Sequence, residues 1–255
     1  MELYYRTQGN GTPVIIIHGL FGDGMNWGGV SRLLREDFHL ILPDMRNHGR
    51  SPHHDDDCTY TSMAADVLTL MDRLELEQAH LVGHSMGGKI AMTIALQAPD
   101  RVSSLTVVDI APKAYQARHQ DVFAGLQAVA DAGASTRQEA EDILRPHITA
   151  TAVRTFILKN LERTDHGFDW RLNWQALQRH YQDLTDFPVD SGSYNGPCQF
   201  LVGGESDYVT SEDQALITRL FPSARGRVVA GAGHWLHAEK PELVARWIKE
   251  FINTA

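Results

Sequence analysis

Short runs of apolar, β-branched residues alternate along this chain with segments in which apolar residues recur every three or four positions. Continuous short runs are typical of buried strands, and the wider spacing is typical of amphipathic helices. The runs predict strands at Val14–Ile17, Phe38–Leu42, His80–Val82, Leu105–Val108, Gln199–Val202 and Arg227–Ala230. Helices are predicted at Met63–Leu74, at Met86–Ala98 and from Pro241 onward. This alternation predicts an α/β fold with a mostly parallel central sheet flanked by helices.

The segment 112–197 interrupts the alternation. It contains no strand-like run, and helical spacing returns there, for example at Val122, Leu126 and Val129. We therefore expect residues 1–111 and 198–255 to form the α/β core and residues 112–197 to form a helical cap inserted between two strands. Such a cap would lie over the strand ends, where open α/β sheets bind ligands. The bulky apolar residues of this segment that we expect to face a ligand are Phe123, Leu126, Phe156, Trp170 and Trp174.

Composition and charge narrow the classes of function. The chain has 255 residues, a hydrophobic fraction of 43% and a formal net charge of −9. Because an anionic surface is repelled by phosphate backbones, a nucleic-acid partner is not expected. No apolar stretch is long enough to cross a membrane, no secretory signal opens the chain, and Cys58 and Cys198 suggest no disulfide framework. We expect a cytoplasmic protein; its oligomeric state is left open.

The strongest chemical signal is Gly83-His84-Ser85-Met86-Gly87, a G-x-S-x-G motif between a predicted strand and a predicted helix. In this context the glycines permit a sharp turn that exposes the serine hydroxyl above the sheet, next to a helix N-terminus. A serine hydroxyl is a weak nucleophile and needs a base. His234, in a loop between the last strand and the last helix, suits that role best, with His237 as its rival. Other histidines, such as His53, His54, His119 and His166, are expected to be solvated.

Cofactor motifs are incomplete. Gly83 to Lys89 resembles a phosphate-binding loop, but Ile90 stands where a hydroxyl should bind Mg²⁺. Gly22-x-Gly24 resembles the start of a dinucleotide fingerprint, but Trp27 replaces its third glycine. The run from His53 to Asp57 lacks the spacing of a metal site. We therefore expect neither a cofactor nor a bound metal.

Several motifs together resemble the α/β-hydrolase fold family, and they occur in the family's order everywhere except in the cap. They are His18 to Gly22, Asp44 to Ser51, Gly83 to Gly87 and Gly233 to Pro241. More narrowly, Arg46 to Gly49, His84 to Lys89, Asp109 to Pro112 and Gly203 to Val209 resemble small bacterial esterases and acyl-thioesterases, relatives of the mitochondrial abhydrolase-domain proteins. The motif layout makes the N–H of Met86 one oxyanion donor. The resemblance implies Leu20, with its neighbour Phe21, as the source of the second.

Two aspartates compete for the role of the acid that orients His234. Most members of this fold place the acid after the strand that follows the cap, where Asp207 stands. The resembled esterases instead use the aspartate that ends the preceding strand, here Asp109, and Ser206 would then support it. Sequence alone cannot decide, because both strand ends border the His234 loop. We favour Asp109, since it directly follows a buried strand and the acid acts from a buried position.

These residues predict a serine hydrolase that cleaves carboxylic esters or acyl thioesters of small molecules through an acyl-enzyme intermediate. A dehalogenase on this fold would carry aspartate in place of Ser85. A C–C bond hydrolase or lyase with the same triad stays open as an alternative, as does a non-catalytic binding protein, although the latter would usually have lost Ser85 or His234.

Overall fold

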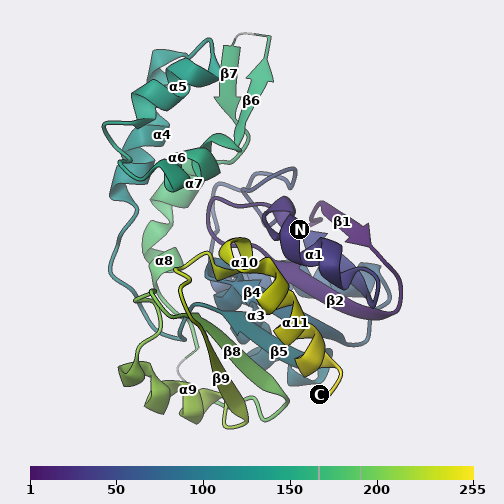
Figure 1. The fold of residues 1–255 in the computed structure, drawn as a ribbon. Coiled ribbons are helices and arrows are strands. Elements are labelled where there is room, and N and C mark those ends of the chain that lie inside the picture. Colours follow the sequence, from purple (N-terminus) through teal and green to yellow (C-terminus); the bar gives the residue numbers. More distant parts are fainter. Residues whose placement is uncertain (166, 190) are drawn as a thin grey trace.

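The structure is a computed structural model that describes residues 1–165, 167–189 and 191–255. His166, which we expected to be solvated, lies outside the described residues. The main sheet has the strand order β1-β3-β2-β4-β5-β8-β9 (Figure 1). Its strands are β1 (Tyr5–Gln8), β2 (Thr12–Ile17), β3 (Phe38–Pro43), β4 (Ala79–His84), β5 (Val102–Val108), β8 (Cys198–Gly203) and β9 (Ala224–Val229).

All pairings in this sheet are parallel except that of β1 with β3. The predicted mostly parallel α/β sheet is therefore confirmed, and each predicted strand is present with shifted ends. β1 was not predicted, because its sequence Tyr-Arg-Thr-Gln has no apolar run and it lies at the sheet edge.

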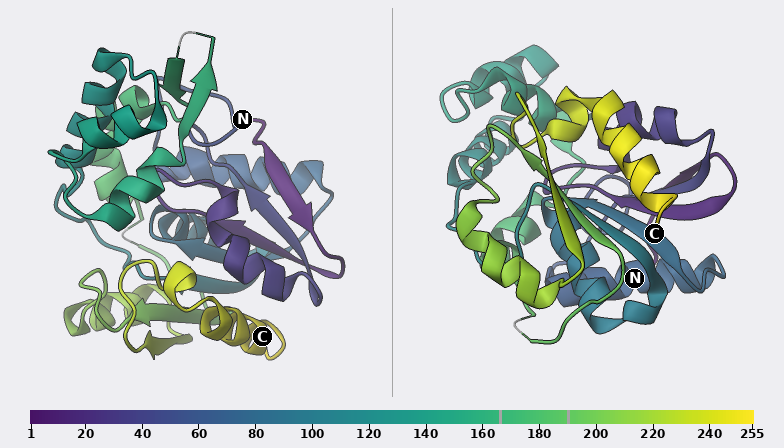
Figure 2. Two further views of the ribbon diagram at one scale, coloured as in Figure 1. Left: turned by 45° about the horizontal axis from the view of Figure 1, so that its top comes forward. Right: turned by 60° about the horizontal axis from the view of Figure 1, so that its bottom comes forward.

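Helices cover both faces of the sheet. On one face α1 (Gly28–Leu34) packs against α11 (Pro241–Ile252), and on the other α2 (Tyr60–Arg73) packs against α3 (Met86–Gln97) (Figure 2). Each face has its own apolar core, so the sheet is buried between two layers. The remaining core helices are α9 (Gln214–Leu220) and the short α10 (Leu236–Glu239), and the 3₁₀ turns are Gly24–Trp27, Pro99–Arg101 and Ser211–Asp213.

Between β5 and β8 the chain leaves the sheet and forms further helices, most of them toward the upper end of Figure 1. They are α4 (Gln120–Ala132), α5 (Arg137–Leu144), α6 (Thr151–Leu158), α7 (Trp174–Arg179) and α8 (Tyr181–Thr185). The side chain of Thr136 accepts a hydrogen bond from the Glu139 N–H and so caps the N-terminus of α5.

The segment was expected to be helical throughout, but it also contains a small antiparallel hairpin of β6 (Leu161–Thr164) and β7 (Gly167–Trp170). The hairpin is mostly polar and half-exposed, so it leaves no apolar run that could be recognised in the sequence. It pairs only with itself and does not join the main sheet.

Candidate active site

Ser85 lies at the turn from β4 to α3, in a backbone conformation that is unusual for a residue with a side chain. Its φ is 53° and its ψ is −116°. The turn closes tightly enough that a Cβ atom on Gly83 would lie 2.2 Å from the carbonyl oxygen of Gly87. A Cβ atom on Gly87 would lie 2.4 Å from the carbonyl oxygen of Ile17. Both glycines are therefore required for the strained turn that presents Ser85.

Two backbone N–H groups border Ser85. Met86 is the first residue of α3, where the helix has no internal partner for its N–H, and Leu20 follows the end of β2. The N–H of the neighbouring Phe21 is already occupied, since it donates to Nε2 of His48 at 3.1 Å. In the part of the chain that the structure describes, the Leu20 and Met86 N–H groups donate to no backbone carbonyl. The geometry thus leaves Leu20 rather than Phe21 free to act with Met86.

His48 was not assigned a role from the sequence, yet it orders this loop. Its Nδ1 donates to the carbonyl of Arg46 at 2.8 Å, so Nε2 is the acceptor for Phe21. Burial, the largest effect, together with nearby His18, lowers the pKa of His48 to about 3, which keeps the ring neutral. The hydrophobic periodicity of the sequence does not identify a residue with this role. Only the position of His48 within the motif from Arg46 to Gly49 could have drawn attention to it.

Asp109 and His234 are joined. Nδ1 of His234 donates to Oδ2 of Asp109 at 2.7 Å, and the Asp109 side chain is fully buried whereas that of His234 is 21% exposed. The N–H of Gly203 donates to the other carboxylate oxygen at 2.8 Å. The Ser206 hydroxyl donates to Oδ2 as well. A carboxylate with these partners suits the task of orienting an imidazole and stabilising its charged form.

Asp207 points elsewhere. Both of its carboxylate oxygens accept hydrogen bonds at 2.9 Å from Nη1 of Arg118, a residue of the segment that follows β5. Both side chains of this pair are largely exposed. The hydrogen bond and the charge of Arg118 lower the pKa of Asp207. Asp207 therefore makes an exposed ion pair and no hydrogen bond with His234.

His237 and His84 form a buried layer beside His234. His237, the rival of His234 in the sequence, is 4% exposed, and its ring packs 4.5 Å from that of Trp27 and 4.3 Å from that of His84, between ring centroids. Nε2 of His84 donates to the carbonyl of His234 at 2.8 Å. Burial and the neighbouring histidines lower the pKa of His84 well below its usual value. His84 therefore fixes the backbone of the His234 loop as a neutral donor.

His119 was expected to be solvated, and this was also wrong. It is half-buried, lines the cavity beside Ser85, and its Nδ1 lies 2.5 Å from the hydroxyl of Tyr181. Burial lowers its pKa to about 4. The cap brings Tyr181 to this position, a contact between distant residues that sequence spacing does not reveal.

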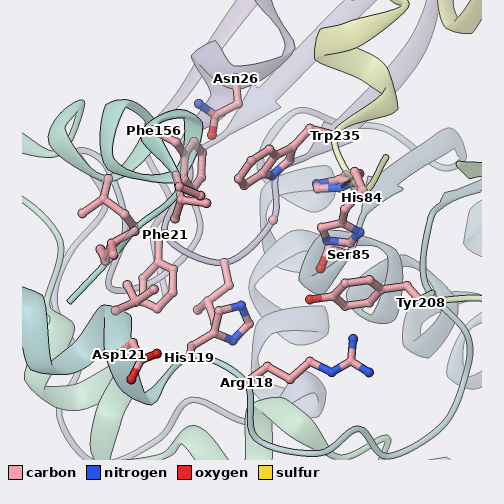
Figure 3. Close-up of a pocket in the computed structure, with 18 of the residues that line it drawn as sticks. Phe21, Asn26, His84, Ser85, Arg118, His119, Asp121, Phe156, Tyr208 and Trp235 are labelled. Atoms are coloured by element: carbon pink, nitrogen blue, oxygen red, sulfur yellow. Dashed lines mark hydrogen bonds between the residues drawn. The ribbon is translucent and has the colours of Figure 1, made fainter. Parts of the chain in front are cut away.

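A cavity of about 370 Å³ lies between the strand ends and the helices of the segment between β5 and β8 (Figure 3). Ser85 and His234 both line it, although no hydrogen bond joins their side chains among the described residues. Such bonds often tighten only when a substrate is bound. Figure 3 shows Phe21 and Phe156 across the cavity from Ser85.

Of the cap residues expected to face a ligand, Phe156 lines this cavity and the others do not. Phe123, Leu126, Trp170 and Trp174 are buried in the apolar core of the cap, where Nε1 of Trp170 donates to the carbonyl of Leu126 at 3.0 Å. From the sequence alone, an aromatic residue that lines the cavity could not be distinguished from one that is buried in the apolar core.

Metal sites and membrane-spanning helices are two further features for which the described residues give a result. Among them, no cluster of histidine, cysteine, aspartate or glutamate side chains could hold a metal ion. None of the helices in residues 1–165, 167–189 and 191–255 has both the length and the apolar character needed to span a bilayer.

Comparisons with known proteins show the family of the chain. The chain is 39% identical over 249 residues to esterase YbfF of Escherichia coli (strain K12), covering 97% of this chain and 96% of that protein. It is 40% identical over 259 residues to the sn-1-specific diacylglycerol lipase ABHD11 of Xenopus tropicalis, covering 98% of this chain and 81% of that protein. The solved structure of a marine microorganism esterase superposes with a TM-score of 0.94 at 38% identity, covering 98% and 99% of the two chains. The sequence profile of the α/β hydrolase fold matches residues 12–241, and the chain therefore belongs to the α/β hydrolase family.

Proposed function

We propose that this protein is a serine esterase in which Ser85, His234 and Asp109 form the catalytic triad and the N–H groups of Leu20 and Met86 form the oxyanion hole. The observation that carries the proposal is the hydrogen bond between Nδ1 of His234 and the buried carboxylate of Asp109, at one edge of the cavity that Ser85 lines. The esterase and lipase names of the relatives support the same reaction class.

In the proposed mechanism, Nε2 of His234 accepts the proton of the Ser85 hydroxyl while the Ser85 oxygen attacks the ester carbonyl carbon. The developing oxyanion is stabilised by the two backbone N–H groups. His234 then donates the proton to the leaving oxygen, and the C–O bond breaks. Water, activated by His234, hydrolyses the acyl-enzyme and restores Ser85. The same steps would cleave an acyl thioester, so thioesters are included in the proposed substrate class.

We further propose that residues 112–197 act as the cap that selects the substrate, over a core of residues 1–111 and 198–255. The cap supplies much of the apolar wall of the cavity, including Val122, Val153, Phe156 and Ile157. Wall residues of this kind determine which apolar groups fit.

The test is hydrolysis of p-nitrophenyl acetate and butyrate, and of the matching thioesters, by the wild type, Ser85→Ala and Ser211→Ala. Ser211 is an exposed serine that does not line the cavity, and it serves as the matched control. We expect Ser85→Ala to lose activity with an unchanged circular dichroism spectrum, and a phosphonate probe to label Ser85 alone. Activity retained in Ser85→Ala would refute the proposal.

A further inference from the structure

Ser85 adjoins a second, much smaller cavity. Its volume is about 50 Å³, against about 370 Å³ for the cavity described above. Leu20, Ser85, Arg118, His119 and Tyr208 contribute to both cavities. An ester bound at Ser85 has two unequal arms, the acyl group and the alcohol, and the site offers two unequal spaces for them.

The position of His234 indicates which arm enters which space. His234 lines the larger cavity and is not part of the wall of the smaller one. Because His234 must hand its proton to the leaving oxygen, the alcohol arm has to run on the side of His234. The acyl arm leaves the same carbonyl carbon in another direction. Met86, whose N–H is a proposed oxyanion donor, lines only the smaller cavity.

Part of the wall of the smaller cavity is buried in the protein core. Tyr60, Met86, Lys89, Ile110 and Leu184 are each at most 6% exposed, so none can turn outward to enlarge it. Because this cavity is much the smaller of the two, it suits the smaller arm of an ester.

Three polar groups at the smaller cavity, the hydroxyls of Tyr60 and Tyr115 and the ammonium group of Lys89, are already bonded to the protein. The Tyr60 hydroxyl donates to the carbonyl of Leu184 at 2.7 Å, and that of Tyr115 donates to the carbonyl of Tyr208 at 2.6 Å. Nζ of Lys89 donates to the carbonyls of Thr185 and Asp186 at 2.9 and 2.6 Å, and lies over the rings of Tyr60 and Tyr115. What remains for a ligand is mainly ring faces and apolar side chains, which suit an uncharged alkyl group.

From these observations we infer that the smaller cavity is the acyl subsite and the larger cavity is the alcohol subsite. The substrates are then esters that join a short, uncharged acyl group to a larger alcohol. This inference rests on the proposed esterase function and deepens it. The bond formed is Ser85 Oγ to the short acyl carbon. The bond broken is that of the acyl carbon to the oxygen of the large alcohol, which takes the proton from His234.

Octyl acetate and ethyl octanoate are isomers that exchange the long and the short arm, so they test the assignment without any variant. We expect kcat/KM for octyl acetate to exceed that for ethyl octanoate by at least about tenfold, because even one methylene without room changes discrimination by 10- to 200-fold. Equal values, or a preference for ethyl octanoate, would overturn the subsite assignment while Ser85-dependent hydrolysis persisted. Loss of all Ser85-dependent ester hydrolysis would instead overturn the proposed function itself.

A matched pair of variants tests the walls. Leu184→Ala enlarges the smaller cavity and should raise the ratio of p-nitrophenyl butyrate to acetate hydrolysis about tenfold. Ile157→Ala removes a buried aliphatic side chain from the wall of the larger cavity alone and should leave that ratio unchanged. If Leu184→Ala does not fold, Leu184→Val should move the ratio in the same direction by a smaller factor. A ratio that responds to Ile157→Ala and not to the Leu184 variants would contradict the assignment.

Discussion

Both carboxylate oxygens of Asp207 lie 2.9 Å from Nη1 of Arg118, and Asp207 is thereby tied to the segment that leads into the cap rather than to His234. This ion pair occupies the position after β8 where most members of the fold place their acid. It contrasts with Asp109, whose buried carboxylate accepts the hydrogen bond of His234.

The two aspartates should respond oppositely to substitution. Asp109→Asn should lower kcat by up to about 10⁴-fold, because an amide can no longer orient His234 in the required tautomer. Asp207→Asn should change kcat little, since an exposed ion pair contributes about 0–1 kcal/mol. Steady-state kinetics on p-nitrophenyl acetate, with folding checked by circular dichroism, measures both. A collapse of kcat in Asp207→Asn with near-normal Asp109→Asn would reverse the assignment of the acid.

Ser206 should act through Asp109. Its hydroxyl donates to the same carboxylate oxygen that accepts from His234, and hydrogen bonds to charged groups contribute about 1.5–3 kcal/mol. Ser206→Ala should therefore lower kcat by roughly 10-fold or more with a smaller change in KM. Ser206→Thr, which keeps the hydroxyl, should recover part of the loss. A pure KM effect would show that Ser206 contacts substrate instead.

His84 should be a positioning residue, with His80 as its control on the same strand. His84 bonds the carbonyl of His234, whereas Nδ1 of His80 lies 2.7 Å from the Ser104 hydroxyl, away from the cavity. His84→Ala should lower kcat by about 10²-fold through displacement of the His234 loop. His84→Gln, whose amide can still donate, should restore part of it. Comparable losses of kcat in His80→Ala would indicate a general effect of strand packing.

Buried neutral histidines predict a loss of stability in acid. Burial lowers the pKa of His48 and of His237 to about 3 from the ordinary value of 6.5. Between these values the unfolded chain binds more protons than the folded one, so the free energy of unfolding falls as the pH falls below 6.5. For each histidine the decrease from about pH 7.5 to about pH 5 is about 2 kcal/mol.

Urea unfolding at the two pH values measures this decrease. His237→Phe removes one titrating ring and should flatten the dependence, whereas His53→Gln changes an exposed histidine and should not. Equal wild-type stability at the two pH values would contradict the prediction.

The comparison of sequence with structure separates what is local from what is not. The strand runs and the G-x-S-x-G context predicted the sheet and the turn at Ser85, because both depend on neighbouring residues. The roles of His84, His119 and Arg118 depend on contacts across the fold, such as the ion pair to Asp207. Asp109 and Asp207 could not be separated with certainty from the sequence, because their surroundings are assembled only when β5, β8 and the His234 loop meet.

The N–H of Ser85 donates to the carbonyl of Val108 at 3.0 Å, one residue before Asp109. Ser85 and Asp109, two members of the proposed triad, are thus held next to each other by the pairing of β4 with β5. Both lie in the chain before the proposed cap begins. Exchange of the cap for that of another relative, by recombination or by grafting, would renew the specificity of the enzyme and leave this pair undisturbed. The third member, His234, is not held by this pairing. Its loop comes last along the chain and is held in place by the hydrogen bond from His84. Displacement of that loop would therefore abolish the proposed activity while the sheet stayed folded.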